Sequence, residues 1–343
     1  MKLLVITQKV DEDDQLLGFF AEWLKRFSKK FDKLTVLCLE KGKYDLPSNI
    51  EIISLGKDRG AGKLKLLSTF YFLLSTRYSD YDAVFVHMNP IWVVLGGLYW
   101  RLTGKKIFFW YTHKAITLKL RLAEKLADVI FTASKESFRL TSKKVIITGH
   151  GIDTRLFQPS EKLKVKSEKL MILSVGRIAP VKNYETLVEA AKILKDEGVD
   201  FSVTMVGEVA LDSDIRYLAS LKLKIKSLKL EGNFSFVGKV NHSDLPQYYQ
   251  SHDIFIHLSK TGSLDKTILE AMACGMNVLS SNDASRSFLP ANLIFEENDP
   301  VNLADKITAV KDTTIDADIR EYVVKYHGLG KLIDKLSKKI LES

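Results

Sequence analysis

Cysteine is scarce in this 343-residue sequence, and its two cysteines, Cys38 and Cys274, lie far apart. Cys38 falls in the apolar stretch TVLCLE, which is typical of a buried strand. Two distant thiols cannot form a disulfide framework, so a small disulfide-stabilised secreted domain is excluded. We therefore expect a protein of a reducing compartment.

Long apolar runs are also missing. The longest, residues 83–102, is interrupted by His87, Asn89 and Pro90, which predicts a strand, a turn and a helix rather than a membrane span. The first residues, MKLLVITQ, reach the acidic run DEDD after a short apolar stretch, unlike a signal peptide. We expect a cytoplasmic protein, and contact with the inner face of a membrane stays open.

The common glycine and metal motifs are absent as well. The segment GKDRGAGKL around Gly62 lacks the spacing of a P-loop, and GHGIDT lacks the third glycine of a dinucleotide fingerprint. The sequence contains no HExxH motif and no cysteine pair for zinc. Kinases, dehydrogenases and metalloproteases are disfavoured, and neither a metal nor an organic cofactor is expected.

Apolar runs rich in β-branched residues alternate with helical patterns along the whole chain, which predicts parallel sheets covered by helices. The fold class is therefore α/β, with two Rossmann-like domains that face a central cleft. We assign residues 1–157 to the first domain, 158–169 to a linker and 170–325 to the second domain. The last segment, about 326–343, has apolar residues at helical spacing and is expected to pack back on the first domain.

The formal charge of +9 is concentrated between residues 101 and 144, which contain eleven Lys or Arg. Such a region attracts phosphates on a membrane, a lipid-linked substrate or nucleic acid, and a solvated helix face is an equal alternative. The amphipathic run at residues 63–77 also favours a membrane-bound or lipid-linked acceptor, although its apolar residues could simply be core.

Two segments of the second domain suggest anion binding. In SKTGSLDKTILEAMACG, Thr267 is expected to cap a helix, with Glu270 completing a capping box. The free N–H groups of that helix start suit a diphosphate, although Glu270 could serve only as a cap. In LSVGRIAPVKN, Arg177 and Lys182 follow a strand and can neutralise a leaving diphosphate, or they can be ordinary surface cations.

Together with HGIDTRLFQP, these segments resemble the retaining nucleotide-sugar glycosyltransferases of family 4, which have the GT-B fold. The resemblance implies that Arg177 and Lys182, beside Gly176, bind the donor diphosphate and that Glu270 hydrogen-bonds the ribose. FVGKV, with Gly238, is similar to the family's loop beside the base. Similarity extends over nearly the whole second domain, including DIFIHLS and IFEENDPVNLADKI.

One departure from the family pattern is clear. Family members commonly carry a glutamate eight residues before the second acidic position, and this chain has Gly262 there. In the family that glutamate contacts the donor sugar. We expect Asp265 to take over a sugar-hydroxyl contact and Lys266 to add a phosphate contact at the helix start.

The first domain offers three weaker candidates. His113 ends the expected strand of KIFFWYTH, where related enzymes place a histidine facing the donor sugar, and the alternative is a structural histidine. His87 ends another strand. Gly18 is the nearest equivalent of the family's glycine loop after the first strand, and it could equally be an ordinary helix glycine.

The resemblance implies a hexosyl transfer from a nucleotide-diphosphate sugar, with UDP and GDP both open, to an unidentified glycan or lipid-linked acceptor. Retention of configuration and metal independence are expected from the family. The alternatives are a catalytically inactive nucleotide-sugar or glycan-binding protein, and an isomerase or phosphorylase of the same fold. Nucleic acid is not expected as a partner, because no recognition motif is visible.

Overall fold

The computed structural model describes residues 1–14, 16–160, 169–259, 262–311, 313 and 317–343. The chain forms two compact units: unit 1 contains Met1–Gly151 and His327–Ser343, and unit 2 contains Ile152–Tyr326. Most of the expected linker, residues 161–168, lies outside the described residues. Each unit has its own sheet and core, as two Rossmann-like domains require.

Unit 1 is built on a seven-stranded parallel sheet with the order β3-β2-β1-β4-β5-β6-β7. The strands are nearly continuous apolar runs because helices cover both faces of the sheet, and all five residues of β4 are buried. Their bounds are β1 (Lys2–Val10), β2 (Lys33–Lys41), β3 (Ile50–Ser54), β4 (Ala83–His87), β5 (Lys106–Trp110), β6 (Val129–Thr132) and β7 (Val145–Ile147).

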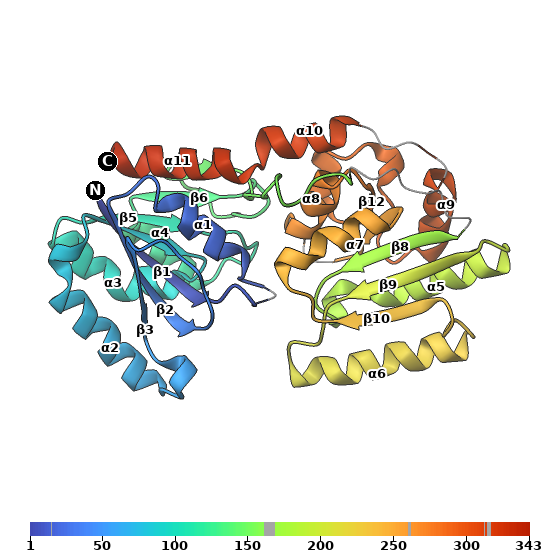
Figure 1. Ribbon diagram of the computed structural model, residues 1–343, viewed down its shortest axis with the longest axis horizontal. Helices are drawn as coiled ribbons and strands as arrows, with labels where there is room; N and C mark the ends of the chain where they lie inside the picture. Colours follow the sequence, from blue (N-terminus) through green and yellow to red (C-terminus); the bar gives the residue numbers. More distant parts are fainter. Residues whose placement is uncertain (15, 161–168, 260–261, 312, 314–316) are drawn as a thin grey trace. The chain divides into compact units, whose positions relative to one another are not determined.

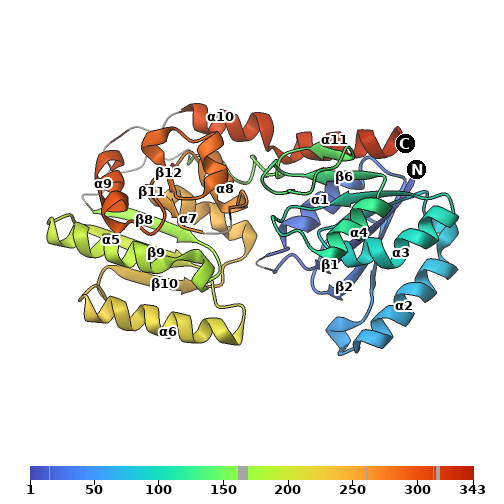
Figure 2. The same cartoon turned by 180° about the vertical axis from the view of Figure 1, so that it is seen from behind.

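Two sets of helices cover this sheet (Figure 1). On one face, α1 (Phe19–Phe27) and α11 (Leu329–Leu341) enclose an aromatic-rich core. On the other face, α2 (Lys63–Thr76), α3 (Pro90–Leu102) and α4 (Leu118–Leu126) pack over a second core. Figure 2 shows these three helices together in front of the sheet.

The last helix returns to unit 1 because its apolar residues form one stripe. Leu332, Leu336 and Ile340 of α11 are buried at helical spacing, and α11 contacts α1. Two chain segments that are far apart in sequence therefore complete the same core.

Unit 2 contains a five-stranded parallel sheet with the order β10-β9-β8-β11-β12. The strands are β8 (Leu170–Val175), β9 (Phe201–Val206), β10 (Phe234–Gly238), β11 (Ile254–His257) and β12 (Asn277–Ser280). The helices are α5 (Tyr184–Asp196), α6 (Asp212–Ser227), α7 (Leu245–Ser251), α8 (Lys266–Ala273), α9 (Pro300–Val310) and α10 (Ala317–Tyr326). The reversal of strand order beside β8 creates a switch point, where α/β sheets commonly bind ligands.

The region 83–102 forms a strand, a turn and a helix, as its interrupting polar residues predict. In the part of the chain that the structure describes, no helix has the length and apolar character needed to cross a bilayer. One strand boundary differs from the prediction. β5 ends at Trp110 rather than His113, because the chain leaves the sheet after its last buried pair with β6.

Candidate functional site

The predicted anion-binding residues of unit 2 lie along one edge of its sheet. All five strands are parallel, so their carboxyl ends share that edge. β8 leads into Gly176 and Arg177, β10 ends at Gly238, and β11 leads into the loop before α8. The fold therefore gathers segments that are distant in sequence.

Glycines end three neighbouring strands at this edge: Gly176 after β8, Gly207 after β9 and Gly238 in β10. The N–H of Gly207 donates to the Gly238 carbonyl at 2.8 Å. Gly207 has a φ of +136°, and a Cβ added to it would lie 2.1 Å from the Gly176 carbonyl oxygen. Sequence reasoning selected Gly176 and Gly238 but missed Gly207, whose only signal was its position after the apolar run FSVTMV.

Alanine at position 207 is therefore expected to destabilise unit 2 by about 3 kcal/mol, since it combines an unfavourable φ with a backbone clash. Gly198 provides a matched control, because its φ is +77° and no atom lies within 4 Å of its added Cβ. Gly198→Ala is expected to cost only about 1 kcal/mol. Urea denaturation of both variants measures the difference, and equal losses would contradict the close-approach explanation.

Lys182, Asp265 and His257 form a polar cluster at the same edge. The Lys182 ammonium lies 2.6 Å from Oδ2 of Asp265, and Nε2 of His257 lies 2.7 Å from the same oxygen. Lys182 ends a short 3₁₀ turn before α5, His257 ends β11, and Asp265 directly precedes α8. Three elements thus converge on one carboxylate oxygen.

The environment fixes the charges of this cluster. Burial tends to raise the pKa of Asp265, but the Lys182 charge and the His257 hydrogen bond outweigh it and hold that pKa well below its usual range. Burial lowers the pKa of His257, although Asp265 partly opposes this effect. At neutral pH the cluster accordingly contains a carboxylate and a neutral imidazole that donates from Nε2.

The arrangement leaves hydrogen-bonding capacity for a ligand. Both contacts to Asp265 use Oδ2, and 25% of its side chain is exposed. Among the described residues, no group donates to its other oxygen, Oδ1. An ammonium has three donors, so Lys182 also retains N–H groups beyond its bond to Asp265. The Lys182–Asp265 ion pair can therefore offer a ligand both an acceptor, Oδ1, and donor N–H groups.

Glu270 is held in the second turn of α8 by two side chains. Its carboxylate lies 3.2 Å from His242 Nε2 and accepts a hydrogen bond from the Tyr249 hydroxyl at 3.1 Å. Burial, followed by the neighbouring Glu270 charge, raises the pKa of Tyr249 well above its ordinary value. Tyr249 therefore stays a donor to Glu270, and sequence reasoning identified neither partner.

The predicted capping box is wrong. α8 begins at Lys266 with Asp265 as its N-cap, and no side-chain capping bond forms. Thr267 therefore lies inside the helix and not at its N-cap, and Glu270 accepts from His242 and Tyr249 instead. The Thr267 hydroxyl oxygen is buried without a hydrogen-bond partner among the described residues. Burial lowers the pKa of Lys266 to about 7, against the opposing effect of Glu270.

Other buried polar atoms near this edge also have no partner within the described part of the chain. They belong to side chains that follow β11 and β12 or end β11: His257 Nδ1, Ser259 Oγ and Ser281 Oγ. Unsatisfied buried polar groups are costly and infrequent in folded proteins. These atoms and the Thr267 hydroxyl lie in segments that reach this edge, so a polar ligand bound here would find partners.

The position eight residues before Glu270 is a glycine, and its backbone conformation favours this residue type. Gly262 has a φ of +63° and is buried. A glutamate in this left-handed backbone conformation would be strained.

Arg177 lies beside the same edge, directly after Gly176. Its side chain is partly exposed, and within the described residues it forms no hydrogen bond or ion pair. Its guanidinium is thus available to a ligand, in contrast to the tethered ammonium of Lys182.

In unit 1, His113 lies in the loop after β5 and is exposed. Its Nδ1 accepts the Ala115 N–H at 3.1 Å, which leaves Nε2 as the donor nitrogen of the ring. His87, the weaker candidate, is buried among aromatic side chains and stacks on Phe20 at 4.2 Å. This environment explains His87 as a core residue.

Gly18 precedes α1 with an ordinary helical backbone. A Cβ there would lie 2.6 Å from the Asp14 carbonyl oxygen and 2.7 Å from that of Glu12. The backbone of the preceding loop therefore fills the space that a side chain at position 18 would need, and this packing explains the glycine. A phosphate contact at Gly18 stays a prediction.

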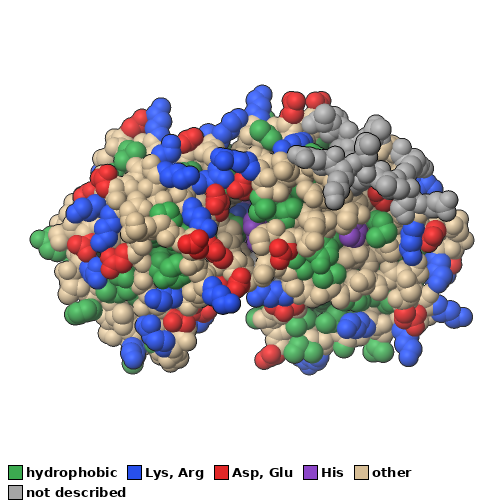
Figure 3. All heavy atoms as spheres, in the orientation of Figure 1, with side chains coloured by type: hydrophobic (Ala, Val, Ile, Leu, Met, Phe, Trp, Pro, Cys, Tyr) green, Lys and Arg blue, Asp and Glu red, His purple; other side chains and the backbone are tan. Residues whose placement is uncertain are grey.

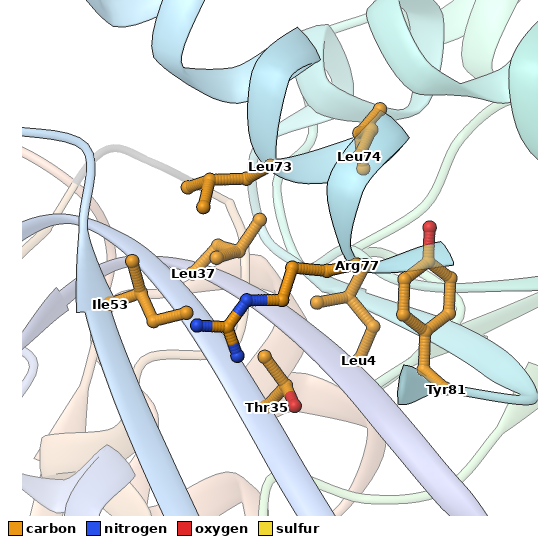
Figure 4. A pocket seen from close by; sticks show the side chains of 8 residues that line it. All are labelled: Leu4, Thr35, Leu37, Ile53, Leu73, Leu74, Arg77 and Tyr81. Carbon is orange, nitrogen blue, oxygen red and sulfur yellow. The ribbon is translucent and has the colours of Figure 1, made fainter. Parts of the chain in front are cut away.

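A small pocket in unit 1 is a packing gap rather than a second candidate site. It lies between α2 and strands β1 to β3, and its lining is mainly aliphatic, as Figure 4 shows. The Arg77 guanidinium enters it and pairs with Glu51 at 2.8 Å. Its lining residues are Leu4, Thr35, Leu37, Ile53, Leu73, Leu74, Arg77 and Tyr81.

Unit 2, which contains this edge, is similar in sequence to known proteins. Residues 158–326 match the family described as "Glycosyl transferases group 1". The chain is 23% identical over 245 residues to 2-deoxystreptamine N-acetyl-D-glucosaminyltransferase of Niallia circulans, covering 62% of this chain and 61% of that protein. It is 28% identical over 149 residues to mannosylfructose-phosphate synthase of Agrobacterium fabrum, covering 41% and 33%. The match thus spans less than two thirds of either relative.

The fold is similar to that of solved structures, among them a glycosyltransferase from Rickettsia africae ESF-5, with a TM-score of 0.77 at 19% identity over 100% of this chain and 99% of that one. Anabaena Alr3699/HepE in complex with UDP and glucose superposes with a TM-score of 0.80 at 18% identity, over all of both chains. This likeness confirms the predicted α/β fold with two Rossmann-like domains of the GT-B type.

Proposed function

We propose, from the match of residues 158–326 to the family described as "Glycosyl transferases group 1", that this chain transfers a sugar from a nucleotide-diphosphate sugar. The observation that carries the proposal is the convergence of Lys182, Asp265 and His257 at the carboxyl edge of the unit 2 sheet. A non-catalytic binding protein, an isomerase or a phosphorylase is not favoured by the relatives.

In this proposal the cations bind the donor diphosphate. Arg177 offers an unpaired guanidinium, and Lys182 offers the N–H groups that Asp265 does not use. Both cations attract the departing diphosphate more strongly as negative charge develops on it. They therefore stabilise the transition state more than the bound donor and lower the barrier to breaking the sugar–phosphate bond. Lys266 and the α8 N–H groups, with Thr267, add donors toward the same phosphates.

Glu270 is proposed to accept hydrogen bonds from the ribose hydroxyls. A carboxylate has about four acceptor positions, and two are occupied by His242 and Tyr249. Those two contacts fix the orientation of the carboxylate before the ligand arrives. Gly176 and Gly238, which carry no side chains at the ends of β8 and β10, would admit the nucleotide close to the backbone.

Asp265 is proposed to accept a donor-sugar hydroxyl through Oδ1, in place of the family glutamate missing at Gly262. His113 of unit 1 is proposed to donate a hydrogen bond from Nε2 to the transferred sugar. By family resemblance, the transfer proceeds with retention of configuration and without a metal, to a glycan or lipid-linked acceptor.

Nucleotide binding tests the donor site directly. Calorimetry with UDP, GDP and ADP should reveal one preferred nucleotide, and Glu270→Gln should weaken it about tenfold to a hundredfold by removing a charged acceptor. Glu231→Gln, an exposed change of the same chemistry in unit 2, should leave affinity unchanged. If none of the nucleotides bound to the wild-type protein, the proposed function would be wrong.

A further inference from the structure

The outward face of the α2–α4 layer in unit 1 is apolar to an unusual degree. Its most exposed large side chains are Leu64 at 85%, Leu102 at 80%, Leu118 at 73%, Leu98 at 65% and Phe72 at 64%. On the opposite side of the same sheet, α1 and α11 expose only one large apolar side chain, Leu341. Sequence alone left the residues of α2 open as core, and the structure places several of them at the surface.

Hydrogen bonds connect these helices into one surface. The Tyr71 hydroxyl donates to the Leu95 carbonyl at 3.1 Å, which joins the exposed part of α2 to α3. The Arg101 guanidinium donates to the Leu126 carbonyl at 3.2 Å, which joins α3 to α4. The exposed Leu98 lies one turn from both Leu95 and Arg101, the α3 residues of these two contacts.

The charges on these helices are almost all positive. The cations are Lys63, Lys65, Arg101, Lys119, Arg121 and Lys125, and none of them forms an ion pair within the described residues. Glu124 is the one acidic residue in α2, α3 and α4, and its carboxylate accepts a hydrogen bond from Ser142 at 2.7 Å. By contrast, Asp and Glu lie among the Lys and Arg on the face of unit 1 in Figure 3.

We propose that the outward face of α2, α3 and α4 docks on an anionic lipid bilayer. Leucine and phenylalanine side chains would enter the boundary between headgroups and acyl chains, while the unpaired cations meet lipid phosphates. A nucleic acid would use the cations and leave the leucines in water. A second copy of the chain would bring six more cations against the first six, so charge complementarity favours the bilayer. The inference depends on unit 1 alone and not on the chemistry of unit 2.

Vesicle flotation with the full chain tests this inference. Vesicles of phosphatidylcholine with about one third phosphatidylglycerol should carry the protein at low salt, and pure phosphatidylcholine should carry much less. Changing Arg101, Arg121 and Lys125 to glutamate should lower partitioning more than about tenfold. Leu98→Ser, Leu102→Ser and Leu118→Ser together should remove the binding that persists when salt screens the charges.

The matched control reverses Lys331, Lys335 and Lys338, which are exposed on α11 at the other side of the sheet. It changes the net charge equally and should leave partitioning close to wild type. Equal losses in both charge variants would overturn the docking face in favour of nonspecific attraction. A lack of flotation at low salt, or leucine variants that only abolish a dimer seen by light scattering, would also overturn it. Salt-sensitive RNA binding unaffected by the leucine changes would count against a membrane in the same way.

Discussion

Replacing Lys182 with methionine is expected to lower turnover of the nucleotide-sugar donor by about a hundred- to thousandfold. The change removes an ammonium whose remaining N–H groups would face the departing diphosphate, while methionine keeps much of the side-chain volume. Because the charge on that diphosphate grows during bond cleavage, the loss should appear mainly in kcat rather than in KM. Initial rates of nucleoside diphosphate release measure the effect.

Lys192→Met is the matched control for this change. Lys192 belongs to α5, just after Lys182 in sequence, and it forms an exposed ion pair with Asp196. Removing an exposed pair of this kind has little effect on stability, and none on turnover is expected. Wild-type kcat in Lys182→Met would contradict the role of this ammonium in leaving-group stabilisation.

The second large effect is expected from Asp265→Asn. Turnover of the donor should fall about tenfold to a hundredfold, and affinity for the sugar conjugate should fall more than affinity for the free nucleoside diphosphate. Asparagine preserves the size of the side chain but removes the charge that holds Lys182 and accepts from His257. Calorimetry with the nucleotide and with its sugar conjugate separates the two contributions, because only the conjugate carries the hydroxyl that Asp265 would accept.

The pH dependence of folding supplies an independent readout for this variant. The pKa of Asp265 is lowered in the folded protein, so its contribution to the free energy of unfolding is present above about pH 4 and disappears as pH falls further. Asp265→Asn should therefore lose more stability at neutral pH than in acid. Asp200→Asn, at an exposed position in unit 2, should lack this dependence. Unchanged turnover, together with a flat stability difference, would contradict the proposed cluster.

The fold was largely predictable because the inner strands of both sheets are buried, nearly continuous apolar runs separated by helical patterns. The final helix was predictable for a similar reason, since its apolar stripe needs a partner. The end of β5 was not, because Tyr111 is also buried and the apolar pattern continues past Trp110.

The candidate site could be predicted only in part. Arg177, Lys182 and Glu270 carry a recognisable local pattern, and the structure brings them to one edge of a sheet. The pairing of Lys182 with Asp265 joins residues 83 positions apart, and no local spacing reports such a contact. The same reason explains why a capping box was predicted for Glu270, whose actual partners come from neighbouring elements.

The outward face of α2 shows a second reason why some features could not be predicted from the sequence. Leu64 and Phe72 belong to an apolar run that also contains the buried Phe70 and Leu74. Hydrophobicity alone cannot distinguish a core residue from an exposed one in so uniformly apolar a helix. Packing of α2 against the sheet decides that Leu64 and Phe72 are exposed while Phe70 and Leu74 are buried.

The most direct test of the account is donor turnover by the wild-type protein and Lys182→Met, measured by mass spectrometry after the nucleotide preference is known. With a mixture of glycan and lipid-linked acceptors, the wild type should release nucleoside diphosphate and form a glycosylated product, and Lys182→Met should release about a hundredfold less. Binding of the donor with equal, background-level release by both proteins would contradict the claim that this edge of unit 2 catalyses sugar transfer.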